Sequence, residues 1–304
     1  MNRPPSIAKT ATAVLLSAVL IGACVTKAHG AVVHRSHGDV LAMGTSAPLP
    51  EAPRNAAGSM FDGLDARIQR ATAEAADAGA DLSVVVLDRR TGQTLANGNN
   101  TPLPVASVAK LFIADDLLLQ VANGQTRLSP ADRDAFDVML RSSDDGAAEE
   151  FWNRDGGSEI ITRVAARYGL AGTTAPYNDR WFNTLSTTGD LVRYYDMLLD
   201  GSGGLPPGQA QIILGDLAQS TPTGVDGYPQ RFGIPDGLSA DPVAIKQGWM
   251  CCWDGPNWMH MSTGVIGSDR RYVMAIGALQ PSDDATARNT LTQAVKTMFP
   301  TGRI

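Results

Sequence analysis

The chain has 304 residues, 43% of them hydrophobic, and a formal net charge of −6 at pH 7. This length allows one large domain or two small ones, and the hydrophobic fraction is that of an ordinary globular protein. An acidic chain without a run of basic residues argues against nucleic acid as a partner.

The N-terminus has the pattern of an export signal. Arg3 and Lys9 precede the apolar stretch TATAVLLSAVLIGA, which is too short for a convincing transmembrane helix. Cys24 follows in LIGAC, which resembles a bacterial lipobox. We expect residues 1–24 to be a signal peptide with Cys24 as the lipidation site, and cleavage by ordinary signal peptidase near Ala28–Ala31 is the alternative. Either way the protein is expected outside the cytoplasm, anchored to the bacterial cell membrane and facing the cell envelope, or secreted.

Residues 25–57 are expected to form a flexible tether, because they contain prolines and small residues and show no helical or alternating period. His29, His34 and His37 lie in this stretch, and we interpret them as solvated linker residues, so no metal site is expected there. The folded domain is expected over residues 58–304.

The first part of this domain predicts a helix, a strand–turn–strand unit and then a series of helices. The expected elements are a helix from Ser59 to Gly79, strands at Leu82–Leu87 and Thr94–Ala96, an apolar helix that stops at Gly124, and helices on both sides of a polar break at Ser142–Asp145. Thr187 and Asp190 are expected to form a capping box for a later helix. The helices are expected to form an all-helical subdomain at about residues 111–215.

The last third of the chain is rich in β-forming residues. DPVAIKQGWMCCW, NWMHMSTGVIG and RRYVMAIGALQ are separated by the turn sequences DGP and GSD, which indicates antiparallel hairpins. Ser282 is expected to cap a final helix, Asp283–Met298. The predicted fold is α/β of the α+β type, with one antiparallel five-stranded sheet built from both chain ends, flanked by helices.

The stretch PLPVASVAKLF places Ser107 three residues before Lys110. A serine hydroxyl is a weak nucleophile until a base removes its proton, and residues three apart on a helix share a face. Burial lowers the pKa of a lysine, which makes its neutral amine a usable base. The alternative interpretation of this spacing is the end of an amphipathic helix.

The surrounding sequence resembles the penicillin-recognising serine hydrolases, which comprise class A β-lactamases, DD-peptidases and their relatives. That family has a strand–turn–strand unit before S-x-x-K, an S-x-N element between helices and K-[ST]-G on a late strand. This chain has LDRRTGQTLANGN, SVAK, MLRSSDDGAAEEFW and IKQGW in the same order, and the resemblance extends from Ser59 to Ile304.

The resemblance implies a role for each matching residue. Ser107 would be the acylated nucleophile, Lys110 its base and Ser143 the proton shuttle to the leaving group. Lys246 would attract a carboxylate and support Ser143. The backbone N–H groups of Ser107 and Trp249 would form the oxyanion hole.

The second and third motifs depart from the family pattern. Asp145 stands where the family has asparagine, so an amide donor is replaced by a carboxylate that accepts hydrogen bonds and favours protonated Lys110. Gln247 replaces a small hydroxyl residue between Lys246 and Gly248, and Trp249 adds bulk beside the expected oxyanion hole.

We expect Gln247, Gly248 and Trp249 to contact substrate. The segment APYNDRWFNTLSTTG lacks the glutamate that class A β-lactamases use to activate water, and Asp179 is the nearest candidate acid.

Cys251 and Cys252 follow on the same predicted strand. We expect two buried thiols, with a vicinal disulfide or an intermolecular bridge as alternatives, and we discount a metal site with His260. The tryptophans and methionines of these strands are expected to pack in the core, with an aromatic lip for a glycan or acyl ligand beside Ser107 as the alternative.

These features predict a β-lactamase-like serine acyl-hydrolase of the cell envelope, with weak or altered activity on β-lactams or peptidoglycan peptides. A catalytically impaired binding or scaffold lipoprotein on the same fold is the alternative. We expect a small-molecule or peptidoglycan-derived ligand, membrane attachment through the lipid anchor, a monomer, and neither a metal nor a cofactor.

Overall fold

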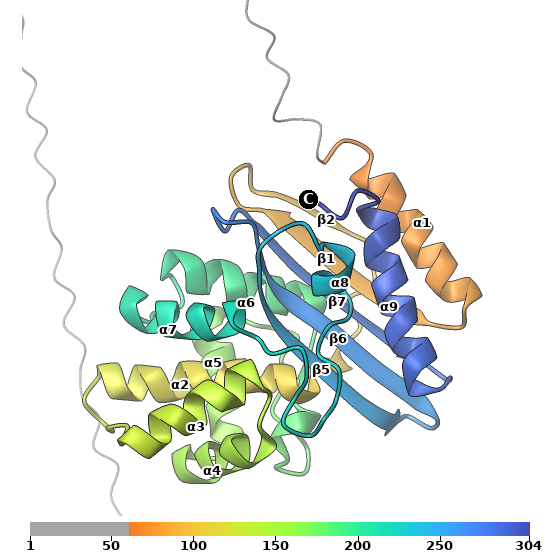
Figure 1. Ribbon diagram of the computed structural model, residues 1–304. Coiled ribbons are helices and arrows are strands. Elements are labelled where there is room, and N and C mark those ends of the chain that lie inside the picture. The colour runs from red at the N-terminus through yellow and green to blue at the C-terminus, as the bar shows by residue number, and fades with distance from the viewer. Residues whose placement is uncertain (1–60) are drawn as a thin grey trace, which may run out of the picture. The chain divides into compact units, whose positions relative to one another are not determined.

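A computed structural model describes residues 61–304, which form an α+β domain (Figure 1). The expected signal peptide, the lipidation site Cys24, the tether and Ser59 lie outside the described residues. No helix within the described part of the chain is long and apolar enough to span a membrane.

A five-stranded antiparallel sheet runs through the domain in the order β2-β1-β7-β6-β5, as expected from the sequence. Its strands are β1 (Asp81–Asp88), β2 (Gln93–Ala96), β5 (Val243–Trp253), β6 (Asn257–Ile266) and β7 (Tyr272–Gln280). The N-terminal β1 pairs with the C-terminal β7, so that both ends of the described chain form one sheet. The late strand β5 lies at one edge, with only β6 as a neighbour in the sheet.

Both faces of the sheet are covered, and the side chains of β1 contribute to a hydrophobic core on each face. Val84 and Val86 belong to the core beneath α1 (Leu64–Asp77) and α9 (Asp284–Met298), whereas Val85 and Leu87 belong to the core on the opposite face. Successive side chains of a strand point to opposite faces, so β1 is apolar throughout its middle rather than alternating. The helices α1 and α9 lie side by side on one face (Figure 1).

The helical subdomain covers the other side and is built around the buried helix α2 (Lys110–Ala122). Around it lie α3 (Pro130–Arg141), α4 (Asp145–Asp155), α5 (Ser158–Tyr168), α6 (Thr188–Asp200) and α7 (Pro207–Ala218). Two acids in α2 are buried, and both are paired: Asp116 accepts from Arg163 at 2.7 Å, and Asp115 accepts from Arg167. These ion pairs explain how a nearly apolar helix carries two carboxylates.

The remaining described elements are short. They are β3 (Leu103–Pro104), β4 (Leu185–Ser186), the 3₁₀ turns η1 (Ala106–Ala109) and η2 (Trp181–Asn183), and α8 (Ile234–Gly237). The strands β3 and β4 pair antiparallel and form a second, two-stranded sheet.

Two predicted helix caps differ from the structure. Asp283 caps α9, accepting from the Thr286 N–H at 3.0 Å, so the prediction of Ser282 as the cap is wrong by one residue. A carboxylate accepts there and also complements the positive end of the helix. Thr187 caps α6 as expected, but the Asp190 carboxylate accepts instead from Gly172 N and Thr173 Oγ1, both at 2.8 Å.

A close backbone contact joins β5 to the turn that precedes α2. A Cβ atom added to Gly248 would lie 2.4 Å from the carbonyl oxygen of Val105 and 3.2 Å from the side chain of Val108. Glycine is therefore required at this position by space, since a methyl group cannot fit without moving the strand away from η1.

We predict that Gly248→Ala lowers the free energy of unfolding by about 1–3 kcal/mol, because overpacking must be relieved by a shift of β5. Gly215→Ala is the matched control: Gly215 lies inside α7 with nothing within 4 Å of an added Cβ, so a gain of about 0.5–1 kcal/mol is expected. Urea unfolding of the two variants measures both values. Equal stability of Gly248→Ala and the unaltered protein would contradict the proposed steric constraint.

Candidate active site

Ser107 lies in η1, the 3₁₀ turn that leads directly into α2, and Lys110 is the first residue of that helix. The Nζ atom of Lys110 lies 3.0 Å from Ser107 Oγ, and the Lys110 side chain is fully buried. Ala106 has φ 43°, in the left-handed region that non-glycine residues rarely adopt. This strained residue turns the chain immediately before Ser107.

Ser143 lies in the connection between α3 and α4 and also has a positive φ, 56°. Its Oγ lies 3.1 Å from Lys110 Nζ and 2.9 Å from Lys246 Nζ, while its carbonyl oxygen accepts from Lys110 at 2.7 Å. Asp144, the next residue, caps α4 by accepting from the Ala147 N–H at 2.6 Å. The predicted first and second motifs therefore meet at the Lys110 amine.

The third motif completes the cluster from β5. Lys246 is only 1% exposed and directs its amine to Ser143. Gln247 is also buried, but its amide donates to the carbonyl oxygens of Gln230 at 3.0 Å and Phe232 at 2.6 Å. A ligand contact through the Gln247 side chain stays a prediction, and its hydrogen bonds favour a role in fixing the strand.

Burial controls the charge state of the two lysines. Desolvation lowers the pKa of Lys110, and the carboxylate of Asp145, 2.6 Å away, opposes that shift. Desolvation also lowers the pKa of Lys246, and repulsion by Lys110 acts in the same direction. Asp226 raises the pKa of both lysines through its charge, with smaller effect. One neutral and one protonated lysine around Ser143 is the arrangement that these opposing effects favour.

Trp181, in η2, is a site residue that the sequence did not indicate. Its ring lies 4.8 Å from Lys110 Nζ, and its indole N–H donates to Glu149 Oε2 at 3.1 Å. Asp179, the candidate acid from the same segment, is exposed and accepts from Ser158 N at 3.1 Å and Ser158 Oγ at 2.7 Å. Its carboxylate is thus engaged at the N-terminus of α5, which does not favour a role in activating water.

A connection between α7 and α8, residues 219–233 and here called the strap, contacts both the second and the third motif. Val225 N donates to Ser142 O at 2.8 Å, next to Ser143, and Thr221 N donates to Arg141 O at 2.9 Å. At its other end the strap carries the carbonyl groups that bind Gln247. The strap therefore holds the Ser143 connection and β5 together.

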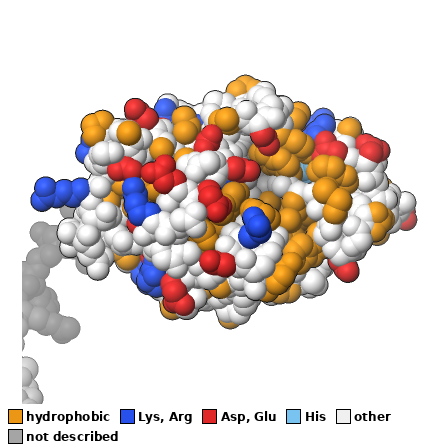
Figure 2. All heavy atoms as spheres, turned by 90° about the horizontal axis from the view of Figure 1, so that it is seen from below, with side chains coloured by type: hydrophobic (Ala, Val, Ile, Leu, Met, Phe, Trp, Pro, Cys, Tyr) orange, Lys and Arg blue, Asp and Glu red, His pale blue; other side chains and the backbone are white. Residues whose placement is uncertain are grey.

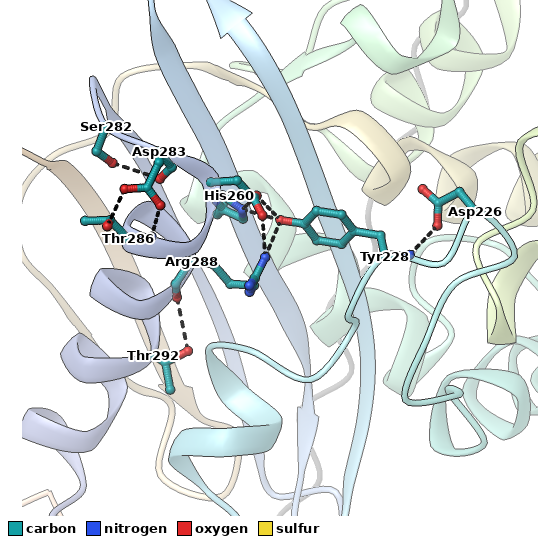
Figure 3. A network of polar contacts seen from close by, with 9 residues as sticks. Asp226, Tyr228, His260, Ser282, Asp283, Thr286, Arg288 and Thr292 are labelled. Carbon is teal, nitrogen blue, oxygen red and sulfur yellow. Dashed lines mark hydrogen bonds and ion pairs between the residues drawn. The ribbon is translucent and has the colours of Figure 1, made fainter.

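Tyr228 anchors the strap to the sheet and α9 (Figure 3). Its ring stacks on Trp249, with centroids 4.3 Å apart and planes at 8°. Its hydroxyl lies 2.7 Å from His260 Nε2, donates to Asp284 and accepts from Arg288 at 3.1 Å. Burial raises the pKa of Tyr228 and lowers that of His260 to about 4, so both are neutral at pH 7.

The prediction that Cys251 and Cys252 are buried is wrong, because both are exposed free thiols.

Met259 and Met261 are buried as expected, whereas the tryptophans of these strands, Trp249, Trp253 and Trp258, are only half-buried. Figure 2 shows hydrophobic side chains gathered on the sheet side of the face seen from below, and acidic side chains on its helical side.

We predict that Tyr228→Phe lowers the free energy of unfolding by about 1–3 kcal/mol, because Asp284 and the buried His260 lose a hydrogen-bond partner while the ring stack remains. Tyr177→Phe is the control, since Tyr177 is 83% exposed, and a change within about 0.5 kcal/mol is expected. Chemical unfolding at pH 7 measures both. An equal effect of the two substitutions would argue against Tyr228 as an anchor.

Comparison with known proteins gives both close relatives and structural neighbours. Proteins named "Putative lipoprotein LppW" from Mycobacterium tuberculosis and Mycobacterium bovis are 65% identical over 255 residues, covering 84% of this chain and 81% of theirs. No protein-family model matches the chain.

Among solved structures, PBP-A aligns with a TM-score of 0.65 at 18% identity, over 79% of this chain and 96% of its own. A PBP-A variant, described as an acyl-enzyme complex with penicillin G, gives 0.65 at 17% identity over the same shares. A class A β-lactamase representative from Bacteroides cellulosilyticus gives 0.62 at 14% identity, over 78% and 97%. The chain therefore belongs to the LppW family and has the fold shared by class A β-lactamases and PBP-A.

Proposed function

We propose that this protein is a β-lactamase-like serine acyl-hydrolase of the cell envelope, with weak or altered activity on β-lactams or peptidoglycan-derived peptides. The observation that carries the proposal is the position of one buried amine. Lys110 Nζ lies within hydrogen-bond distance of both Ser107 Oγ and Ser143 Oγ, and Lys246 contacts the same Ser143. Three segments distant in sequence thus supply a nucleophile, a base and a proton relay.

Acylation would proceed through these groups. Neutral Lys110 accepts the Ser107 proton as Oγ attacks the carbonyl carbon, and the backbone N–H groups of Ser107 and Trp249 stabilise the oxyanion. The Ser143 hydroxyl then gives its proton to the leaving amine and is reprotonated by Lys110. When Lys110 is neutral it no longer repels Lys246, so Lys246 is then the protonated lysine of the pair. Its charge next to Ser143 favours the approach of a carboxylate on the substrate and supports the relay electrostatically.

Slow turnover follows from two features of the site. The Asp145 carboxylate raises the pKa of Lys110 and so reduces the fraction of neutral base at neutral pH. The second feature is that the Asp179 carboxylate accepts a hydrogen bond at the N-terminus of α5. The aromatic ring of Trp181, from the same segment, is the group that lies beside Lys110 instead. Because the Asp179 carboxylate is engaged by Ser158 rather than free to activate a deacylating water, we expect a long-lived acyl-enzyme.

Localisation and partners belong to the same proposal. The relatives named as lipoproteins and the LIGAC sequence support export and attachment to the cell membrane through Cys24. The penicillin-binding fold supports a small-molecule or peptidoglycan-derived ligand, bound by a monomer near Gly248 and Trp249.

A second candidate function, a non-catalytic binding or scaffold lipoprotein, is favoured by one observation. Lys110 pairs with Asp145 at 2.6 Å, and an ammonium ion held by a carboxylate cannot accept the Ser107 proton. The two candidates differ in whether Ser107 is ever acylated.

We predict that a penicillin at millimolar concentration adds its mass to the protein, and that Ser107→Ala abolishes the adduct. Intact-mass spectrometry over time measures both formation and lifetime: hours of persistence indicate a peptidase-like acyl-enzyme, and rapid loss indicates a lactamase. The absence of any Ser107-dependent adduct would favour the scaffold function.

We predict that Asp145→Asn increases the acylation rate several-fold at neutral pH. Asp145 raises the pKa of Lys110, so its replacement lowers that pKa, and the rise of acylation rate with pH moves to lower pH. Asp226→Asn is the control, because Asp226 acts on Lys110 through its charge alone, and a smaller shift in the same direction is expected. A slower Asp145→Asn variant with an unmoved pH profile would contradict the proposed role of Asp145.

A further inference from the structure

Cys251 and Cys252 lie at an interruption in the pairing of β5 with β6. Met250 pairs with Met259, but the next pair is Trp253 with Asn257, so a β-bulge contains the two cysteines. Cys252 has φ 67°, a left-handed conformation that is unfavourable for a residue with a Cβ. The bulge therefore gives this pair a backbone that a regular strand would not have.

The bulge also changes where the side chains point. On a regular strand adjacent side chains lie on opposite faces, and two neighbouring thiols cannot meet. Within the bulge this alternation does not hold, because Cys251 and Cys252 have no paired residues on β6 and Cys252 has a left-handed backbone conformation. The Cys252 side chain raises the pKa of Cys251 through a hydrogen bond. Both side chains are exposed, so an incoming reagent can reach them.

We propose that Cys251 and Cys252 form a thiol–disulfide exchange site, whose substrate class is the disulfide of a small thiol or of another protein. One cysteine thiolate attacks the substrate disulfide, forming a mixed disulfide and releasing one thiol. The second cysteine, as its thiolate, then attacks the sulfur of the first and releases the other thiol. The two cysteines lose two electrons and two protons, and the substrate disulfide is reduced to two thiols.

The geometry favours a reversible site over a structural crosslink. Adjacent Cα atoms lie about 3.8 Å apart across a trans peptide, whereas disulfide-linked Cα atoms are usually about 4.4–6.8 Å apart. A disulfide between neighbours is therefore strained, and strained, exposed disulfides are the easily reduced ones. The exchange site lies two residues after Trp249, yet its chemistry does not depend on acylation of Ser107.

The test uses the full chain with Cys24→Ser, which leaves Cys251 and Cys252 as its two cysteines. The reduced protein is treated with oxidised glutathione, and intact mass is read after acid quenching. We expect the loss of two hydrogens without retained glutathione, within a single peptide that contains both cysteines, and full reversal by a dithiol reductant. Cys251→Ser and Cys252→Ser, each in the same background, should instead stop at one stable glutathione adduct.

Three results would overturn the proposal. They are two glutathione molecules retained on one chain, a disulfide-linked dimer on a non-reducing gel, and no reaction under conditions that oxidise a free dithiol peptide of the same sequence. Acylation by penicillin is measured separately with both cysteines replaced by serine. A failure of either proposal thus leaves the other one testable.

Discussion

The removal of two lysine amines from water is the physical constraint on which the candidate site depends. Lys110 and Lys246 are both almost completely buried, and each uses Ser143 as a hydrogen-bond partner. An unpaired buried ammonium ion is costly, so the surrounding groups must either supply negative charge or allow one amine to be neutral. The chain does both, because Asp145 pairs with Lys110 while the pKa of Lys246 is lowered by burial and by its neighbour.

This constraint gives Asp145, in the second motif, a direct influence on the charge of Lys110. Asp145 is 71% exposed, so its own charge is well solvated even though its partner is buried. The pair lets the fold tolerate a protonated Lys110, at the expense of the neutral amine that serine activation requires. Aspartate at position 145, where the family has asparagine, thus affects both the stability of the buried Lys110 and the fraction of Lys110 that can act as a base.

The order of the elements and the Ser107–Lys110 motif could be predicted from sequence, because they depend on local spacing. Ser107 and Lys110 share a helix face by their separation alone, and the strand pattern that places Lys246 late in the chain is strongly β-forming. Gln247, Trp181 and Tyr228 could not be assigned in this way, since their roles come from contacts with segments far away in sequence. The exposure of the cysteines could not be predicted either, because it depends on a β-bulge between Met250 and Trp253 that the strand pattern does not reveal.

The strap has a consequence for how the domain opens. Its backbone donates a hydrogen bond to Ser142 at one point and accepts one from the Gln247 amide at another. The same segment therefore stabilises both the connection that carries Ser143 and the strand that carries Lys246. Local fluctuations that release such a segment expose everything that it holds in a single cooperative unit. Amide hydrogens near Ser143 and on β5 should therefore exchange with solvent at matching rates. A protease cut at the exposed Val225–Asp226 bond would break the strap between its contact with Ser142 and its contacts with Gln247, without touching Ser143 or either lysine.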